Sequence, residues 1–484
     1  MSRPPLQSHY EVIVIGAGMS GMAAAIRLGH FGKKVLLLDR HGVIGGLNSF
    51  YKQNGRKFDV GLHAVTNYVP AGTKRAPLTK LLRQLRLSHE EWDLSPQVGS
   101  RIAFPDVDLC FTNDFALLES EIARAFPAEI DRFRGLVDKV REFDELRLDG
   151  PDLLARSVLA EHLRDPLLID MLLCPLMYYG SAREGDMDFY QFVIMFKALF
   201  LEGFARPFEG VRHITQLLLR RLRELKVERV MNCGVKVLHA ADDRIVAVEL
   251  EDGRQLTADH ILSSAGLPET GLLLNETARS REAKTIPPEG SGERRLSFVE
   301  TIGVFPQQPR DLGWEETIIF FNDAPSFAYA RPTDLVDPRS GVICFPNNYQ
   351  YGEGRQLDEG FMRVTCLANP GGWMNLPEED YRREKARWFD RIATSALRFL
   401  PGSASWNDLK PSLVGTDMFT PRTVKKYTGH LDGAVYGATN KVRNGTTPFR
   451  NLYLCGTDQG FLGITGAMLS GISMANLHIL QAGA

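Results

Sequence analysis

The sequence has 484 residues, and its 57 Lys and Arg nearly balance its 59 Asp and Glu, which leaves a formal net charge of −2. One hydrophobic core rarely supports a chain of this length, so we expect two domains. The balanced charge argues against the broad positive surface of a nucleic-acid-binding protein, and we expect no nucleic-acid partner.

Six cysteines are scattered along the chain, with no C-x-x-C pair and no metal-ligand spacing to histidine. We interpret them as reduced, mostly buried thiols and expect no metal site. The N-terminal MSRPPLQSHY has no apolar stretch typical of a secretory signal or an anchor. No apolar run approaches the roughly 18 to 20 residues that span a bilayer. We therefore expect a cytoplasmic protein that does not cross a membrane.

The N-terminal elements predict a nucleotide-binding βαβ unit. Residues 10–15 form a continuous apolar run, which is typical of a buried parallel strand. A helix is expected over residues 20–31, with Gly32 as its left-handed cap, and residues 34–39 form the next strand.

The middle of the chain predicts a second domain with mixed structure. Residues 73–202 are mainly helical in pattern, and a return helix at 214–225 leads into a strand meander. A long charged helix is expected at 378–399 and a final helix at 466–480. The remaining expected strands are 230–238, 245–250, 255–262, 317–321, 326–330, 341–345, 362–368 and 452–455.

Three glycines lie directly between the first strand and the first helix. Gly16, Gly18 and Gly21 form G-A-G-M-S-G, where a tight turn and a close pyrophosphate both require a missing Cβ. Asp39 ends the second strand, where a carboxylate meets the hydroxyls of an adenosine ribose, and Arg40 follows it. The pattern predicts a dinucleotide site, the alternative being a purely structural turn.

The segment DRHGVIGGLNSFYKQNGRKFDVGLHAV, which starts at Asp39, resembles the N-terminal signature of a flavoprotein superfamily. That superfamily contains phytoene desaturases, carotenoid isomerases and retinol saturases. The resemblance implies FAD as the cofactor and places Gly45, Gly46 and Gly61 along it.

The C-terminal NLYLCGTDQGFLGITGAMLSG is similar to the second flavin motif of the same superfamily. The similarity implies that Asp458, after Gly456, approaches the ribityl chain, and that Gly463, Ile464 and Gly466 pass close to the flavin ring. A glycine-rich turn that opens a helix would direct amides and a positive dipole end at a reduced, anionic flavin. The alternative is a C-terminal helix that only packs.

Between these motifs, Asn232-Cys233-Gly234-Val235 resembles the superfamily's entry into the adenine-side meander, with backbone hydrogen bonds from Val235 to adenine. We therefore expect an α/β protein with a discontinuous Rossmann-like FAD-binding domain and an interleaved mixed α+β substrate domain. The FAD domain would comprise residues 1–70, 205–268 and 415–484, and the substrate domain residues 71–204 and 269–414.

Two details favour retinol saturase-like members, namely the histidine of FDVGLH and G-T-D followed by G-I-x-G-A, although Thr457 stands where saturases carry glutamine. His63 is the candidate catalytic residue, because an imidazole can exchange a proton beside a polyene carbon. The alternative is a histidine that holds a loop or a flavin atom by a hydrogen bond. Tyr178 and Tyr179 either line the substrate chamber or pack in the core.

Two apolar segments allow alternative interpretations. Residues 77–87 form a basic amphipathic helix that either faces the core or lies on an anionic membrane. Residues 192–204 form either domain core or the wall of an apolar tunnel. No second G-x-G-x-x-G follows a strand, since Gly290-Ser291-Gly292 lies in a charged loop. Electrons would therefore pass to or from an external carrier, a quinone or oxygen.

We expect an FAD-dependent oxidoreductase that acts on carbon–carbon double bonds of a hydrophobic isoprenoid or polyene, by desaturation, saturation or isomerisation. Its partners would be that substrate and, peripherally, a membrane. The alternatives are an amine oxidase-like flavoprotein and a non-catalytic prenyl-binding escort protein.

Overall fold

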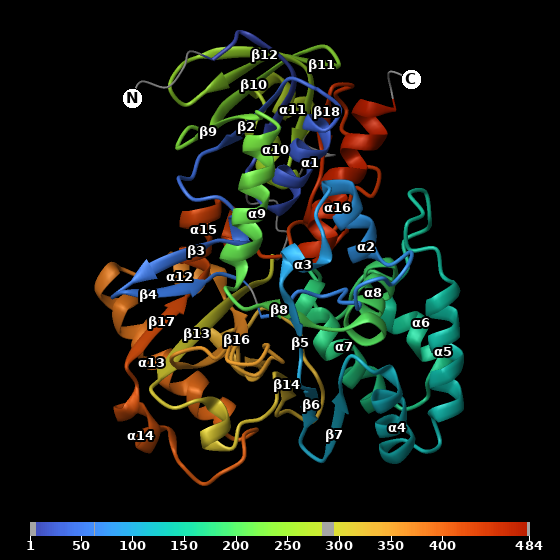
Figure 1. The fold of residues 1–484 in the computed structure, drawn as a ribbon, viewed down its shortest axis with the longest axis vertical. Coiled ribbons are helices and arrows are strands. Elements are labelled where there is room, and N and C mark those ends of the chain that lie inside the picture. The colour runs from blue at the N-terminus through green and yellow to red at the C-terminus, as the bar shows by residue number, and fades with distance from the viewer. Residues whose placement is uncertain (1–5, 62, 283–294, 482–484) are drawn as a thin grey trace.

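A computed structural model describes residues 6–61, 63–282 and 295–481. Two sheets lie one above the other along the long axis of the molecule, with the nucleotide-binding elements at the top of Figure 1. Gly290-Ser291-Gly292 lies outside the described residues. The expected α/β class, with a Rossmann-like unit and a second mixed domain, is confirmed.

The first sheet is built around the predicted βαβ unit. Strand β1 pairs in parallel with β2 on one side and β12 on the other, because its apolar run is buried on both faces. β9 and β18 extend the parallel part, while β11 and β10 continue antiparallel. The strands are β1 (His9–Ile15), β2 (Val35–Asp39), β9 (Glu228–Met231), β10 (Val235–Ala241), β11 (Arg244–Leu250), β12 (Gln255–Ser263) and β18 (Leu452–Leu454).

Helices pack on one face of this sheet in a single core. They are α1 (Met19–Gly29), α2 (Pro77–Leu85), α3 (His89–Trp92), α9 (Val211–Glu224) and α16 (Gly463–Ala475). The four leucines of α2 are buried, so the core-facing interpretation of residues 77–87 is confirmed. α10 (Leu267–Leu273) and α11 (Glu276–Glu282) follow β12 in the chain.

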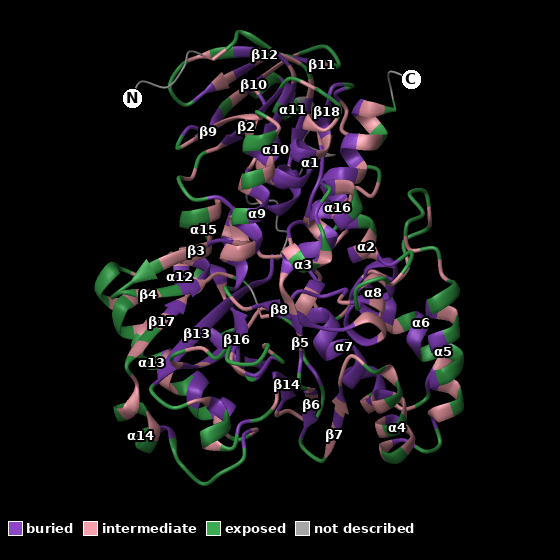
Figure 2. Ribbon diagram, viewed as in Figure 1, coloured by how far each residue is buried: buried purple, intermediate pink, exposed green. Residues whose placement is uncertain are grey.

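Helices pack on both faces of the second sheet. Most residues of its strands are therefore buried (Figure 2). Alternate residues such as Ile318 and Phe320 pack on one helical layer, and Ile319 and Phe321 on the other. In sheet order, the strands are β17 (Gly415–Phe419), β13 (Ser297–Phe305), β16 (Gly360–Ala368), β15 (Val336–Cys344), β14 (Ile318–Asn322), β6 (Ser100–Phe104) and β7 (Val107–Phe111).

The first layer contains α4 (Phe115–Ala125), α5 (Ile130–Glu142), α6 (Ala155–His162), α7 (Pro166–Gly180) and α8 (Phe189–Phe196), which continues as the π-helical turn Lys197–Glu202. The second contains α12 (Pro370–Met374), α13 (Glu378–Leu397) and α14 (Trp406–Leu409). α15 (Pro421–Thr428) lies beside the hairpin β3 (Phe50–Gln53) and β4 (Arg56–Asp59) in Figure 1, and β5 (Leu94–Pro96) pairs with β8 (Ala205–Pro207).

The structure corrects several expected elements. The mainly helical segment 73–202 also contains β5, β6 and β7. Residues 326–330 form no strand, because their backbone bonds to the α7 region: Phe327 N donates to Asp170 Oδ2 at 3.0 Å, and Tyr329 O accepts from Gly185 N at 2.7 Å. The strand expected at 230–238 is divided into β9 and β10. The fully buried β13 was not predicted.

The predicted division into two domains stays a prediction. β17 falls within residues 415–484, which were assigned to the FAD domain, yet it pairs with β13 in the second sheet. Among the described residues, Gly463–Leu480 is long and apolar enough to cross a membrane, with a mean hydropathy of 1.2. The sequence predicted a helix at 466–480 but no membrane span there. Since 56% of Gly463–Leu480 is buried and α16 packs on α1, we interpret it as a core helix.

Candidate functional site

The glycine turn between β1 and α1 leaves space for a phosphate group. A Cβ on Gly16 would lie 2.5 Å from Ser264 Oγ, and one on Gly21 would lie 2.0 Å from the carbonyl oxygen of Gly16. A Cβ on Gly18, by contrast, would meet no atom within 4 Å. Gly18 therefore borders open space at the N-terminus of α1, where backbone amides and the helix dipole favour an anion.

The second glycine pair lies against this turn. Gly45 N donates to the carbonyl oxygen of Ala17 at 2.9 Å, and Gly45 forms a bridge with Gly18. A Cβ on Gly46 would stand 3.5 Å from Gly18 Cα. Gly61 closes the same region, since its Cβ would come within 2.3 Å of the carbonyl oxygen of Leu47. The structure thus brings together glycines that are far apart in the sequence.

Asp39, Arg40 and Val235 gather at the carboxyl end of β2. The Asp39 carboxylate accepts hydrogen bonds from Ala17 N at 2.7 Å and His41 N at 2.8 Å. Burial raises the pKa of Asp39, and the two amides act in the opposite direction. Each carboxylate oxygen retains a lone pair for a ribose hydroxyl. Arg40 lies 3.6 Å from Glu251, and Val235 begins β10 beside it.

The C-terminal motif meets the N-terminal one. A Cβ on Gly456 would lie 3.0 Å from Ser20 Oγ of α1, and one on Gly463 would lie 2.8 Å from Thr66 Oγ1. Ile464 is buried at the start of α16. At Gly466 the nearest atoms belong to Phe461, at 3.4 Å or more, so no close approach to the rest of the protein requires glycine there.

Asp458 is 1% exposed and points into the protein. Its carboxylate accepts hydrogen bonds from Ala438 N at 2.7 Å and Leu267 N at 2.5 Å, and Lys441 Nζ lies 3.5 Å away. Asp458 is not among the residues that line the large cavity described next. Its approach to a ribityl chain stays a prediction.

A cavity of about 880 Å³ lies between the two sheets. Its size is that of a ligand-binding pocket. Five predicted site residues line it: Gly46, Gly61, His63, Gly463 and Ile464. The cavity therefore begins at the glycine-rich cofactor loops and continues toward the second sheet. These features fit a dinucleotide whose pyrophosphate lies at Gly18 and whose ring system enters this cavity.

Aromatic side chains form the inner wall of the cavity. Tyr178, Tyr179, Phe298 and Tyr436 line it, while Tyr178 and Tyr179 also pack in the core of the first helical layer, so both interpretations of the tyrosine pair stay open. The Tyr178 hydroxyl lies 2.8 Å from Ser340 Oγ, and Tyr436 donates to the Tyr178 carbonyl. Within the described part of the chain, the buried Tyr179 hydroxyl has no partner. Because burial raises its pKa, Tyr179 stays a neutral donor for a bound group.

His63 reaches two strands of the second sheet. Its Nε2 lies 2.9 Å from Glu300 Oε1 of β13 and 3.1 Å from Thr365 Oγ1 of β16. Arg363 donates to both carboxylate oxygens of Glu300, at 2.7 and 2.8 Å. Burial alone would raise the pKa of Glu300, but the charges and hydrogen bonds of Arg363 and His63 lower it to about 2.

A second buried ion pair, between Arg206 and Asp59, is hydrogen-bonded to this network. Arg206 lies 2.5 Å from Asp59 Oδ2, and Arg363 donates to the Asp59 carbonyl oxygen at 3.1 Å. Sequence reasoning missed Glu300, Arg363 and Arg206. One signal was available: SFVETIGVF and GFMRVTCLA each contain a single charged residue in an otherwise uncharged strand. Such lone opposite charges are usually paired when they are buried.

The mouth of the cavity carries charged groups. Tyr51 donates to Asp417 Oδ2 at 2.5 Å, and Lys385 lies 3.9 Å from the same carboxylate. Lys426 and Tyr427 of α15 are exposed at this edge. Residues 192–204 are not among those that line this cavity and lie mostly in the buried core of the first helical layer, which supports the core interpretation and leaves the tunnel wall a prediction.

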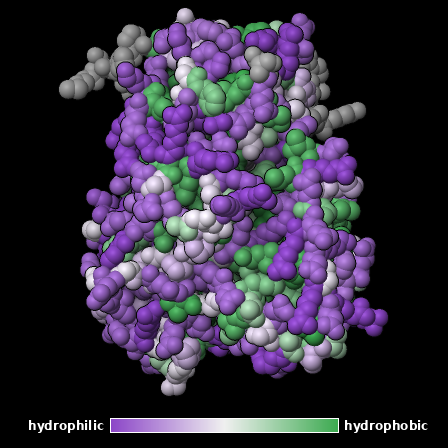
Figure 3. All heavy atoms as spheres, turned by 45° about the vertical axis from the view of Figure 1, so that its right-hand side comes forward, coloured by the Kyte–Doolittle hydropathy of each residue, from purple (hydrophilic) through white to green (hydrophobic). Residues whose placement is uncertain are grey.

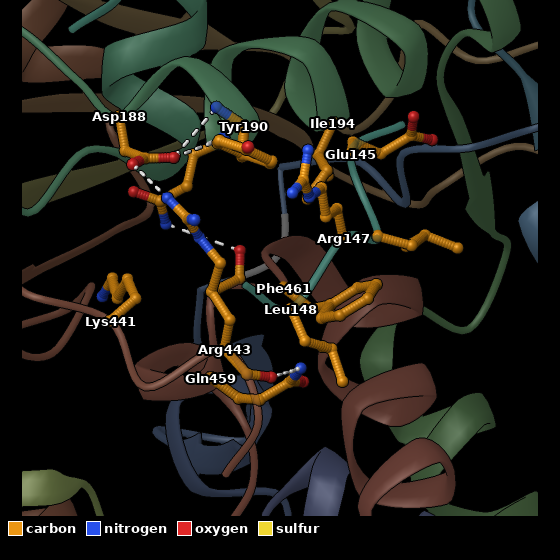
Figure 4. Close-up of a pocket in the computed structure, with 13 residues that line it drawn as sticks. Glu145, Arg147, Leu148, Asp188, Tyr190, Ile194, Lys441, Arg443, Gln459 and Phe461 are labelled. Carbon is orange, nitrogen blue, oxygen red and sulfur yellow. Dashed lines mark hydrogen bonds and ion pairs between the residues drawn. The ribbon is translucent and has the colours of Figure 1, made fainter. Parts of the chain in front are cut away.

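A second, much smaller hollow of about 20 Å³ lies beside the C-terminal motif (Figure 4). The Arg443 guanidinium stacks 3.8 Å from the centre of the Tyr190 ring and lies 2.9 Å from Asp188. Gln459 donates to the Arg443 carbonyl oxygen at 2.6 Å. The hollow has room for about one water molecule. We infer that the contacts of Arg443 around this hollow hold the C-terminal glycine loop against α8.

Comparisons with known proteins agree with this geometry. The family described as flavin containing amine oxidoreductase matches residues 19–477. The 4,4'-diaponeurosporene oxygenase of Staphylococcus haemolyticus is 24% identical over 459 residues, which cover 89% of this chain and 87% of the relative. The lycopene-forming phytoene desaturase of Pantoea ananas is 25% identical over 522 residues, which cover 96% and 98%. The solved structure of an oxidoreductase from Methanosarcina mazei matches with a TM-score of 0.63 at 15% identity, covering 96% of this chain and 99% of that one.

Proposed function

Because the chain belongs to the family of flavin-containing amine oxidoreductases and is an FAD-dependent oxidoreductase, we propose that it acts on a hydrophobic isoprenoid polyene. The reaction is desaturation, saturation or isomerisation at carbon–carbon double bonds. The observation that carries the proposal is the aromatic cavity of about 880 Å³ that opens directly from the glycine loops of the cofactor site. The similarity to relatives named for phytoene and diaponeurosporene supports it over nearly the whole chain.

The protein's own residues have a limited task in this chemistry. Bound FAD supplies the acceptor or donor of hydride. The aromatic wall orients the extended substrate and excludes water, and few titratable groups are required. His63 is the titratable side chain at the junction of the cofactor loops and the aromatic wall.

Anaerobic incubation of the purified holoprotein with a panel of polyenes tests the proposal. Flavin absorbance and product mass are followed together. A loss of two hydrogens with flavin bleaching identifies desaturation, a gain of two with prereduced enzyme identifies saturation, and an unchanged mass with a changed double-bond geometry identifies isomerisation. If no polyene bleaches the flavin or undergoes a change in its own mass or double-bond geometry, the proposal fails.

An amine oxidase-like activity is the second candidate, favoured by the aromatic side chains of the cavity and by the family description. Among the described residues, three carboxylates line the cavity, and each already has a partner: Glu300 pairs with Arg363, Glu378 with Arg382 and Arg422, and Asp417 accepts from Tyr51. A cationic amine would have to compete with these partners, which favours the polyene. The same anaerobic assay with amines separates the two candidates, since only an amine oxidase is bleached by them.

Within the superfamily, we propose a retinol saturase-like member, on the basis of His63 in FDVGLH and the G-I-x-G-A of the last helix. We also propose that an external carrier, a quinone or oxygen exchanges electrons with the flavin. Reoxidation of the substrate-reduced enzyme, measured separately with oxygen and with a soluble quinone, identifies the acceptor.

We further propose that the protein is cytoplasmic and attaches peripherally to membranes through α15. Lys425, Lys426 and Tyr427 are exposed on α15 at the cavity mouth, where a lipid-dissolved substrate would enter. On the face of the molecule that Figure 3 shows, hydrophobic residues form separate groups between hydrophilic ones. Flotation with anionic liposomes tests the attachment.

Lys425→Glu/Lys426→Glu should lower the bound fraction in this assay. Lys80→Glu/Arg83→Glu on α2 is the control, because the apolar face of that helix is buried. If wild-type protein stays unbound, the attachment is refuted.

A further inference from the structure

His63 presents its two ring nitrogens to different surroundings. The side chain is 15% exposed and lines the cavity, while Nε2 is directed at Glu300 and Thr365. No described residue forms a hydrogen bond with the other nitrogen, Nδ1. The backbone of His63 is also held, since Tyr349 donates to its carbonyl oxygen at 2.8 Å. The two nitrogens therefore differ in what they can do.

Glu300 accepts hydrogen bonds and does not donate them. Its side chain is 10% exposed and that of Arg363 is 3% exposed, and the guanidinium pairs with both carboxylate oxygens. Against the effect of burial, the guanidinium of Arg363 lowers the pKa of Glu300 to about 2, so the carboxyl is ionised at neutral pH. An ionised carboxylate 2.9 Å from Nε2 requires a proton on that nitrogen, because two lone pairs would repel at this distance.

The Thr365 hydroxyl could favour the other tautomer of His63. It lies 3.1 Å from Nε2 and would favour a proton on Nδ1 if it donated to Nε2. That arrangement would place the unprotonated Nε2 against the Glu300 anion. A hydrogen bond to a charged acceptor is roughly twice as strong as a neutral one, so Glu300 decides the tautomer and Thr365 does not.

The other charged groups near His63 are already paired. Arg363 forms an ion pair with Glu300, and Arg206 forms an ion pair with Asp59. The Tyr179 ring stands 6.1 Å from the imidazole, at the wall of the cavity. With neutral His63, the two ion pairs leave the network without net charge. If the imidazole gains a proton, its positive charge lies next to the Glu300 carboxylate, and the two ion pairs can stay as they are.

We propose that Glu300 is a positioning residue that holds His63 as the Nε2–H tautomer and so directs the basic lone pair of Nδ1 into the cavity. A carboxylate that orients a histidine in this way is a general device of histidine chemistry. The inference rests on the proposed function for its chemical meaning, because it makes His63 the residue that exchanges a proton with the polyene.

The proposed step balances in the direction of desaturation. One hydrogen leaves a substrate carbon with both electrons of its C–H bond and passes to FAD as hydride. A proton leaves the neighbouring carbon for Nδ1, and the electron pair of that second C–H bond forms the new carbon–carbon π bond. Saturation would be the reverse, with the anionic reduced flavin FADH⁻ supplying the hydride and doubly protonated His63 supplying the proton.

Nitrogen-15 NMR of the histidine side chains in the holoprotein tests the tautomer directly. The chain has 11 histidines, and the His63→Gln variant assigns the signal by its loss. We expect a two-bond correlation pattern with the proton on Nε2. A proton on Nδ1, or an even mixture of the two tautomers, overturns the proposal. This measurement needs no change at Glu300.

Variants then test the role of the carboxylate. In Glu300→Gln the amide NH₂ can donate to Nε2, so the Nε2–H fraction should fall, and kcat with the polyene should fall at least tenfold with a smaller change in KM. Thr365→Val is the matched control and should keep the tautomer. If Glu300→Gln does not fold, the double variant Glu300→Leu/Arg363→Met removes both charges together. An unchanged tautomer in the folded variant overturns the proposal.

The two proposals fail differently. If His63 is the Nε2–H tautomer but the protein desaturates, saturates or isomerises no polyene, the proposed function is refuted and the positioning role of Glu300 remains. An Nδ1–H tautomer in a protein that turns over a polyene refutes the positioning role and leaves the function.

Discussion

Gly471 of α16 lies directly on the carbonyl oxygen of Ser20 in α1, since a Cβ built on Gly471 would stand 2.0 Å from that oxygen. Two helices from opposite ends of the chain thus pack with almost no space between their backbones. α1 carries the first glycine turn at its N-terminus, and α16 starts at the second. The contact holds the two glycine turns close together, where we propose that one cofactor binds.

We predict that Gly471→Val separates these helices. The added atoms overlap backbone, which cannot move aside as a side chain can, and overpacking of this kind costs about 1–3 kcal/mol. Both the free energy of unfolding in urea and the flavin content of the purified protein should fall. Gly135→Ala on the exposed face of α5 is the control, because its Cβ would meet no atom within 4 Å. An unchanged flavin content in Gly471→Val would contradict the predicted packing.

We predict that Gly18→Val abolishes flavin retention without unfolding the protein. Gly18 has an ordinary φ of −73° and its Cβ would enter open space, so valine is tolerated until a pyrophosphate competes for that space. The purified variant should be colourless, with an unfolding midpoint close to that of wild-type apoprotein.

Gly21→Ala is the informative comparison, because its Cβ would overlap the carbonyl oxygen of Gly16 and destabilise the apoprotein itself. Full yellow colour in Gly18→Val would refute the pyrophosphate position.

Glu202 predicts a pH dependence of stability. Burial raises the pKa of this carboxyl from 4.5 to about 7, partly offset by the hydrogen bond from Asn67. The folded state therefore favours the protonated acid. The stability that the protonated Glu202 contributes is fully present below the unfolded pKa near 4.5, and it is lost as the pH rises through about 7. At about 1.4 kcal/mol per pKa unit, the carboxylate costs about 3 kcal/mol at pH 8.

We therefore predict that Glu202→Gln stabilises the protein at pH 8 by up to about 3 kcal/mol and has little effect at pH 4. The glutamine amide oxygen can still accept from Asn67 Nδ2. Urea unfolding at the two pH values measures the difference. Glu161→Gln on the exposed end of α6 should change stability at neither pH. Equal effects of Glu202→Gln at both pH values would show that ionisation is not the cause.

We predict that Asp59→Asn costs about 3–5 kcal/mol, because it leaves the charge of the buried Arg206 without its carboxylate. The two side chains are 9% and 6% exposed. Asp252→Asn breaks a pair whose side chains are 44% and 40% exposed, and should cost less than about 1 kcal/mol. Chemical denaturation of both variants provides the comparison. Similar losses in the two would mean that burial does not govern the Asp59 pair.

The sequence by itself determined the parts of this protein whose signals are local. The apolar run before Gly16, the spacing of Gly16, Gly18 and Gly21, and Asp39 at the end of the next strand specify a βαβ unit, because turn geometry and strand burial act over a few residues. The four leucines of α2 likewise repeat at helical spacing and are all buried. The resemblance predicted flavin contacts at Gly45, Gly61 and Gly463, and the structure brings these three glycines to the turn at Gly18 or to the cavity.

Only the tertiary structure decided which distant residues meet. His63 and Glu300 are 237 residues apart and become neighbours only in the folded chain, and Glu300 meets Arg363 because β13 lies beside β16 in the second sheet. No local pattern encodes strand order, and β13, which is wholly buried, lacks the alternation that marks a half-exposed strand. The stability of a buried charge depends on its partner across the sheet, so the role of Glu300 could be seen only when Arg363 and His63 were in place.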